Sequence, residues 1–141
     1  MEAQSAKLPR GFRNNNPLNL RISGIQWRGK IPVTQNTDGA FEQFDTMRNG
    51  IRAALINIRT YINKYHCDTP KLIIRRWAPD SDGNNSQRYC ETVCKLINSN
   101  PNRLVLFTNR KDVCRLVYGM IYVECGRTID LTDILDAYDA I

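Results

Sequence analysis

Glu124 has the position in this sequence that best suits acid–base chemistry. It continues an apolar stripe at helical spacing, and Gly126 follows it, where a helix C-cap would sit. A carboxylate on the core side of a helix, at its carbonyl end, loses solvation and meets the negative end of the helix dipole. Both effects raise its pKa, which suits a general acid. The alternative is a helix-end carboxylate that turns to solvent or pairs with Arg127. The stripe consists of Val113, Leu116, Val117, Met120 and Ile121.

A second carboxylate would be needed by a glycosidase of the two-carboxylate kind. Asp38, Glu42 and Asp45 are the candidates, and Asp38 and Glu42 are the two we carry forward as catalytic residues. Either one would stabilise positive charge at a sugar or position a water molecule. Asp38 precedes Gly39 and also fits a simple turn, whereas Glu42 also fits a solvated position opposite Phe41.

Several side chains could bind a sugar polymer. Asn15, Asn16 and Asn19 could hydrogen-bond to sugar hydroxyls and N-acetyl groups, and Trp27 and Tyr89 could stack on sugar rings. Asparagine also supports turns unaided, and aromatic side chains also fill cores, so each residue alone is a weak indication.

The sequence gives little indication of a metal site or a nucleotide-binding site. The five cysteines contain no paired CxxC, and the single histidine cannot complete a usual zinc set. The chain also has no phosphate-binding glycine loop. We therefore expect no metal and no organic cofactor.

The elements that must position these residues are mostly helices. Apolar periodicity and capping residues predict helices from residue 47 onward, and the longest of them spans about residues 47–65. A short extended piece is expected at Leu104–Phe107. The expected helix starts are Met47, Thr69–Pro70, Ser86, Thr108 or Asn109, and Thr132.

The first third of the chain lacks the helical periodicity of the rest. Residues 10–19 predict an irregular loop, and short extended pieces punctuated by glycines then predict a small twisted hairpin region. The sum is an α+β fold: one domain over residues 10–141, with a flexible arm at residues 1–9. The extended pieces are Leu18–Arg21, Gln26–Arg28, Ile31–Thr34 and Ala40–Phe44.

The net charge and the hydropathy of the chain limit the classes of partner that it could bind. The net charge of +6 suits polyanions, which include nucleic acid and anionic cell-wall polymers, but no nucleic-acid motif supports the first class. No run of residues is apolar enough to span a membrane, and the N-terminus lacks an apolar signal region. We expect synthesis in the cytoplasm, and action in a virion or, after delivery by lysis or a secretion machine, at the periplasm and cell wall.

Four stretches together resemble a family of small phage and prophage virion-associated proteins. They are "RGFRNNNPLNLR", "WRG", "FEQFDTMRNGIRAALINIRTY" and "IIRRWAPDSDGNNSQRY". The first two also look like the segment that follows the catalytic glutamate in lytic transglycosylases and glucosaminidases. Here "LVYGMIYVECGR", which carries Glu124, lies at the other end of the chain. The resemblance therefore implies a lysozyme-like domain in circularly permuted order.

The function that this resemblance implies is cleavage of bacterial peptidoglycan, by a muramidase or a lytic transglycosylase. Glu124 would protonate the leaving oxygen, with Asp38 or Glu42 assisting and Asn15, Asn16, Asn19, Trp27 and Tyr89 lining the cleft. The alternative is a non-catalytic virion or assembly protein that keeps the fold and binds other virion or secretion-machine proteins.

Overall fold

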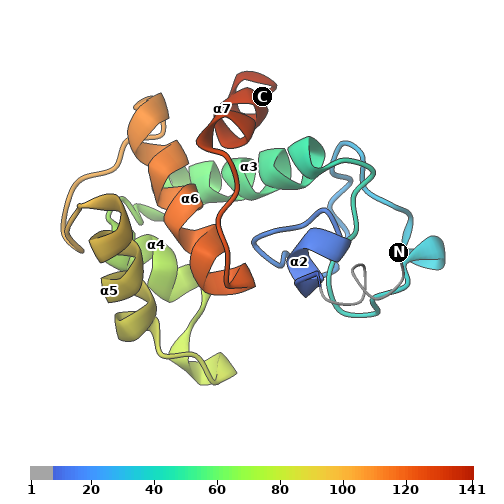
Figure 1. The fold of residues 1–141 in the computed structure, drawn as a ribbon, viewed down its shortest axis with the longest axis horizontal. Coiled ribbons are helices and arrows are strands. Elements are labelled where there is room, and N and C mark those ends of the chain that lie inside the picture. Colours follow the sequence, from blue (N-terminus) through green and yellow to red (C-terminus); the bar gives the residue numbers. More distant parts are fainter. Residues whose placement is uncertain (1–7) are drawn as a thin grey trace.

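The computed structural model describes residues 8–141, and helices dominate it (Figure 1). The expected flexible arm at residues 1–9 falls mostly outside the described residues. The α-helices are α2 (Arg10–Arg13), α3 (Met47–Tyr65), α4 (Pro70–Trp77), α5 (Ser86–Ile97), α6 (Arg110–Cys125) and α7 (Leu131–Asp139). Two 3₁₀-helices, η1 (Val33–Gln35) and η2 (Asp80–Asp82), interrupt the loops.

Side-chain caps fix where the long helices begin. The Thr46 side chain accepts a hydrogen bond from the backbone N–H of Asn49 at the start of α3, and Thr69 does the same for Leu72 at the start of α4. Asn109 caps α6 in the same way. Gly126 ends α6 in the left-handed conformation, with φ of 76°, as a C-cap glycine does.

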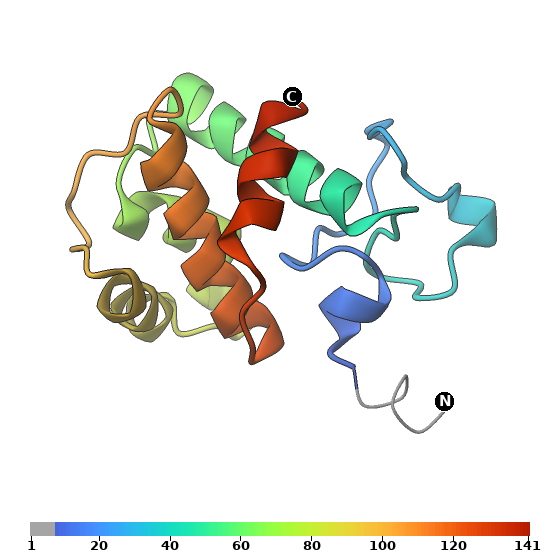
Figure 2. The same ribbon diagram turned by 45° about the horizontal axis from the view of Figure 1, so that its top comes forward.

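Helix α6 lies at the centre of the helical part of the molecule. It packs against α5 on one side and α7 on the other, while α3 packs against α7 and α4 against α5 (Figures 1 and 2). Burial of the apolar stripes of these helices is the main source of stability. Fully covered side chains of the core include Ile51, Leu55, Ile58, Ile73, Val117, Met120, Ile121 and Ile134.

The expected α+β class, a lysozyme-like domain with a β-hairpin region, is wrong on this point. Apart from α2 and η1, residues 8–46 form irregular loops that lie together beside the longer helices (Figures 1 and 2). Within residues 8–141 the only β contacts are two isolated bridges, Arg21 with Phe41 and Lys30 with Phe44. Part of the third extended piece is instead η1, and Leu104–Phe107 forms no strand.

Side chains take the hydrogen bonds that a sheet ladder would have made. The Asn16 amide donates to the carbonyl oxygens of Leu20 (3.0 Å) and Glu42 (2.9 Å), and its own oxygen accepts from the Leu20 N–H. Because Asn16 is completely buried, its amide ties two loop segments together without strand pairing. This explains why residues with extended character form no hairpin.

Gly50 is the point where α3 meets these loops. Its backbone lies so close to Asn15 that a Cβ atom at residue 50 would overlap the Asn15 carbonyl oxygen. Asn15 itself has a positive φ of 51°. Only glycine allows α3 to approach the asparagine loop this closely.

Candidate active site

Glu124 lies in the last turn of α6 and accepts two hydrogen bonds. The Asn19 amide nitrogen donates to its Oε1 (2.9 Å), and the Tyr89 hydroxyl donates to its Oε2 (2.9 Å). Asn19 comes from the N-terminal loops and Tyr89 from α5. The site therefore joins three segments that are far apart in the sequence.

Burial raises the pKa of Glu124 above its usual value. The hydrogen bonds from Asn19 and Tyr89 favour the charged carboxylate and offset part of this effect. The Tyr89 hydroxyl keeps its proton, because burial and the neighbouring Glu124 charge hold its pKa well above the ordinary value. Arg127 does not pair with Glu124; its guanidinium carbon lies 5.8 Å from the Phe12 ring centroid.

Asn19 is held in an unusual conformation beside this carboxylate. Its φ is 55°, in the left-handed region that asparagine tolerates better than most residues. Its side-chain oxygen is buried without a hydrogen-bond partner among the described residues. The neighbouring Leu18 carbonyl accepts a hydrogen bond from the Trp77 indole (3.1 Å), which fixes the loop to α4.

Each of the two donors to Glu124 lines a groove, although Glu124 itself is not in the lining of either. The first, the aromatic groove, has a volume of about 320 Å³, and its lining includes Asn19, Arg21, Trp27, Tyr61, Arg76 and Trp77. The second, the tyrosine groove, has a volume of about 490 Å³, and its lining includes Asn85, Arg88, Tyr89, Tyr122 and Gly126. Asn19 lines the first groove and Tyr89 lines the second, and both donate to the same Glu124 carboxyl.

Cys125, the next residue of α6, packs against the N-terminal loop and α2. Its thiol donates to the Pro17 carbonyl oxygen (3.2 Å), and a Cβ atom at Gly11 would lie 2.8 Å from its sulfur. Burial, together with the nearby Glu124 charge, raises the Cys125 pKa to about 12. The side chain is therefore a neutral packing group between α6 and α2 at neutral pH.

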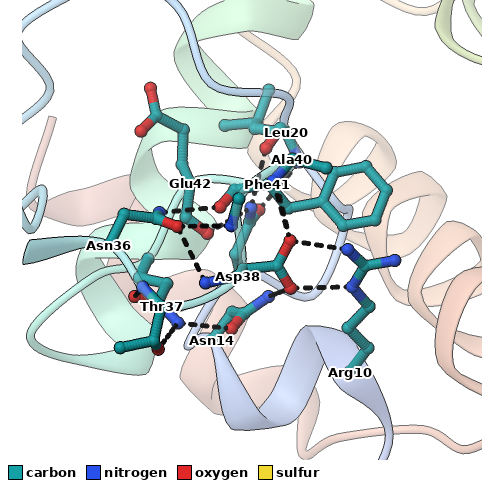
Figure 3. Close-up of polar contacts among 12 residues, drawn as sticks. Arg10, Asn14, Leu20, Asn36, Thr37, Asp38, Ala40, Phe41 and Glu42 are labelled. Carbon is teal, nitrogen blue, oxygen red and sulfur yellow. Dashed lines mark hydrogen bonds and ion pairs between the residues drawn. The ribbon is translucent and has the colours of Figure 1, made fainter. Parts of the chain in front are cut away.

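Asp38 is fully engaged within the loops (Figure 3). Arg10 donates to both of its carboxylate oxygens (2.7 and 2.6 Å), and the Asn14 amide adds a third hydrogen bond (2.9 Å). The backbone N–H groups of Ala40 and Phe41 also donate to it. These contacts, led by the one from Arg10, lower the Asp38 pKa far below its ordinary range.

Glu42 is completely buried and forms an ion pair with Lys30. The Lys30 ammonium lies 2.9 Å from its Oε2, which also accepts from the Ser23 N–H (3.1 Å). The same ammonium donates to the carbonyl oxygens of Ser23 and Ile25. Figure 3 shows the Glu42 and Asp38 carboxylates pointing away from one another. Neither makes a hydrogen bond to Glu124 or its two donors.

The other expected sugar-binding residues divide into two groups. Asn19, Trp27 and Tyr89 lie along the two grooves, whereas the Asn15 amide donates to the Phe44 carbonyl (3.0 Å) and the Asn16 amide is buried in the loops. The sequence did not single out Arg76, which lines the aromatic groove. No spacing rule links Arg76 on α4 to the tyrosines of α3 before their packing is known.

Two kinds of feature are absent from residues 8–141. These residues contain no group of three or more histidine, cysteine, aspartate or glutamate residues placed to hold a metal ion. In that same part of the chain, none of the helices combines the length and the apolar character needed to cross a bilayer.

Comparison with known proteins gives a phage relative. Over 87 residues the chain is 41% identical to Protein P5 of Pseudoalteromonas phage PM2. The matched region covers 60% of this chain and 52% of that protein, so the chain spans about half the length of the curated relative it matches. No family model matches the sequence. Over the matched region, the chain is thus similar to a bacteriophage protein.

Proposed function

We propose that this protein cleaves the glycan strands of peptidoglycan, with Glu124 as its general acid. The observation that carries the proposal is the Glu124 carboxyl itself, which burial biases toward its protonated form while Asn19 and Tyr89 fix its orientation. A carboxylic acid that holds its proton closer to neutral pH is what protonation of a glycosidic oxygen requires.

The two grooves suit a linear polymer. A strand that runs from the aromatic groove into the tyrosine groove would pass the Glu124 carboxyl with sugar units on both sides. Trp27 and Trp77 offer flat apolar faces to sugar rings on the first side, and Tyr122 does so on the second. The pattern that resembles lytic transglycosylases, with a glutamate at a helix end, supports the same substrate.

The reaction needs only one protein carboxylate in its transglycosylase form. Glu124 gives its proton to the bridging oxygen as the bond from that oxygen to the muramic acid C1 breaks. The C6 hydroxyl of the same sugar then bonds to C1, and its proton returns to Glu124. The acid is regenerated and no water is consumed. In the muramidase form, water takes the place of the C6 hydroxyl.

We assign Asp38 and Glu42 to the support of the loops that carry Asn19 and Trp27. Arg10 holds Asp38 and Lys30 holds Glu42, so neither carboxylate is free to assist at a sugar in this arrangement. This assignment favours the single-carboxylate reaction over one with a second protein acid.

A peptidoglycan digestion tests the proposal. Purified protein and its Glu124→Gln variant are incubated with sacculi, and soluble muropeptides are separated by chromatography and identified by mass. We expect products from the wild type only, with a loss of roughly 100-fold or more in the variant. Anhydro ends on the products indicate transglycosylation, and reducing ends indicate hydrolysis. Equal release by both proteins would refute Glu124 as the acid, and no release by either across a range of pH would refute the enzyme.

The second candidate is a non-catalytic virion protein. It is favoured by the similarity to a phage protein and by the engagement of Asp38 and Glu42 in the loops. Such a protein would bind other virion components or glycan without cleaving it. Retained binding to sacculi with no soluble products from the wild type would select this candidate.

A further inference from the structure

Arg76 presents a fixed cation to the aromatic groove. Its guanidinium carbon lies 3.8 Å from the Tyr65 ring centroid and 5.2 Å from the Tyr61 ring centroid. Tyr61 in turn meets Trp77 edge-on, with 5.8 Å between ring centroids. Stacking on aromatic rings orients a guanidinium while leaving its N–H edge available.

The cations of this groove are not neutralised by protein carboxylates. Of the ion pairs within residues 8–141, none includes Arg76 or Arg21, the second arginine in the lining. Asp82 also lines the groove, so the lining carries two positive charges against one negative charge. An oriented guanidinium without a carboxylate partner is suited to bind a carboxylate through two parallel hydrogen bonds.

We infer that Arg76, assisted by Arg21, recognises a carboxylate on the peptide stem of the peptidoglycan strand. This inference rests on the proposed function. The glycan chain itself offers few negative charges, because the lactyl group of muramic acid is capped by the peptide. The free carboxylates lie on that peptide, beside the sugar ring that the neighbouring tryptophans would stack on. Arg76 would therefore make the protein specific for peptide-bearing strands over bare glycan.

The test compares two forms of one substrate. Peptidoglycan strands are used with their stems intact and after an amidase has removed the stems. The lactyl carboxylate that the amidase exposes is then converted to a neutral amide, so the bare strands carry neither peptide nor that negative charge. We expect the wild type to show a kcat/KM about tenfold or more higher on the peptide-bearing strands, as one charge-assisted contact would give. Arg76→Gln should lose most of this preference, so that its ratio of kcat/KM on the two substrates approaches one.

Two control variants separate charge recognition from structural damage. Arg75 is the exposed neighbour of Arg76 and does not line the aromatic groove, so Arg75→Gln should keep the preference. Arg76→Lys keeps the charge but not the two-pronged geometry and should restore only part of it. Circular dichroism and melting temperature confirm that each variant is folded.

The outcomes distinguish this inference from the proposed function. Equal rates on both substrates, or a preference that survives in Arg76→Gln, overturn the inference and leave the glycosidase standing. If the wild type cleaves neither substrate, calorimetry compares the binding of a disaccharide-peptide with that of the same disaccharide without peptide, its lactyl group converted to a neutral amide. Tighter binding of the peptide form that depends on Arg76 supports the inference, and equal or absent binding overturns it.

Discussion

Asn19 and Glu124 are hydrogen-bonded although 105 positions of sequence separate them. The bond joins an irregular loop to the last turn of α6, and it uses only one of the two polar atoms of the asparagine amide. The Asn19 oxygen is buried and has no hydrogen-bond partner within residues 8–141. If the amide turns over, this oxygen can accept a hydrogen bond from a neutral, protonated side chain at residue 124. The asparagine can therefore serve both protonation states of the acid.

Replacing the acid by its neutral analogue should stabilise the fold near neutral pH. Because the Glu124 pKa is raised on folding, its proton stabilises the folded protein fully at low pH, and this contribution is lost as pH rises through the folded-state pKa. The glutamine in Glu124→Gln stays neutral at every pH. The Asn19 amide can turn over so that its oxygen accepts a hydrogen bond from the glutamine amide. Its melting temperature should exceed that of the wild type at about pH 7, and the gap should close toward about pH 4. A gap that is absent or reversed at neutral pH contradicts this reading of the burial.

Removing the Tyr89 hydroxyl should shift the pH dependence of activity. Its hydrogen bond favours the charged form of Glu124, so Tyr89→Phe should raise the Glu124 pKa further. The acid then stays protonated to higher pH, and the alkaline limb of the kcat/KM profile moves upward. Tyr122→Phe, in the same groove but without a hydrogen bond to Glu124, should leave the limb in place. If the alkaline limb of Tyr89→Phe stays in place or moves to lower pH, the result would count against Glu124 as the acid.

The Lys30–Glu42 pair should be important for stability. Lys30→Met leaves the Glu42 charge buried without its partner and should cost about 3–5 kcal/mol of unfolding free energy, measured by urea denaturation. Removing both charges, as Lys30→Met with Glu42→Leu, should recover most of the loss. The exposed pair Arg110–Asp139 is the control, and Arg110→Gln should leave the midpoint nearly unchanged. A small effect of Lys30→Met would mean that the loops rearrange around Glu42.

The charged Asp38 side chain should stabilise the fold, and this contribution should be greatest at pH values above the ordinary aspartate range. Its depressed pKa means that its contribution is present above the ordinary aspartate range and is lost as pH falls through the values at which Asp38 takes up its proton. Asp38→Asn should therefore unfold at lower urea than the wild type at about pH 7, with the two proteins converging at low pH. Its activity per folded molecule should be nearly unchanged. A large loss of kcat in folded Asp38→Asn would restore Asp38 as a second catalytic carboxylate.

Gly50 and Gly24 give a matched pair of glycine substitutions. Gly50→Ala places a Cβ against the Asn15 carbonyl and should cost about 3 kcal/mol or more. A Cβ at Gly24 meets no atom within 4 Å, so Gly24→Ala should change the unfolding free energy by less than about 1 kcal/mol. Similar effects at both positions would show that α3 can move away from the asparagine loop.

The helices were predictable because local signals define them. The periodic stripe from Met47 to Tyr65 matches α3, and Thr69 with Pro70 marks the start of α4 as expected. Asn109 and Gly126 similarly bound α6. Each of these signals depends on residues within a few positions of one another, which a single sequence displays directly.

The loops were not predictable, because long-range side-chain contacts determine them. The sequence suggested strands where the Asn16 amide and the Lys30–Glu42 pair hold the backbone instead. Glu124 could be predicted as an acid from its position at a helix end. Tyr89 and Asn19 could be predicted as binding residues only from the chemistry of their side chains. That these three meet, and that Arg76 stacks on the tyrosines of α3, follows from packing that no short window of sequence contains.

Asn19, Tyr89 and Glu124 are far apart in the sequence. Their separation determines at which stage of translation the site can form. Asn19 leaves the ribosome first and Glu124 last of the three. A chain interrupted before residue 124 carries no acid, and α3 and α6 lack part of their cover until α7 has emerged. Products that end between residues 89 and 124 therefore hold the two donors without the group that they orient. The three residues can meet only in chains translated to the end of α6.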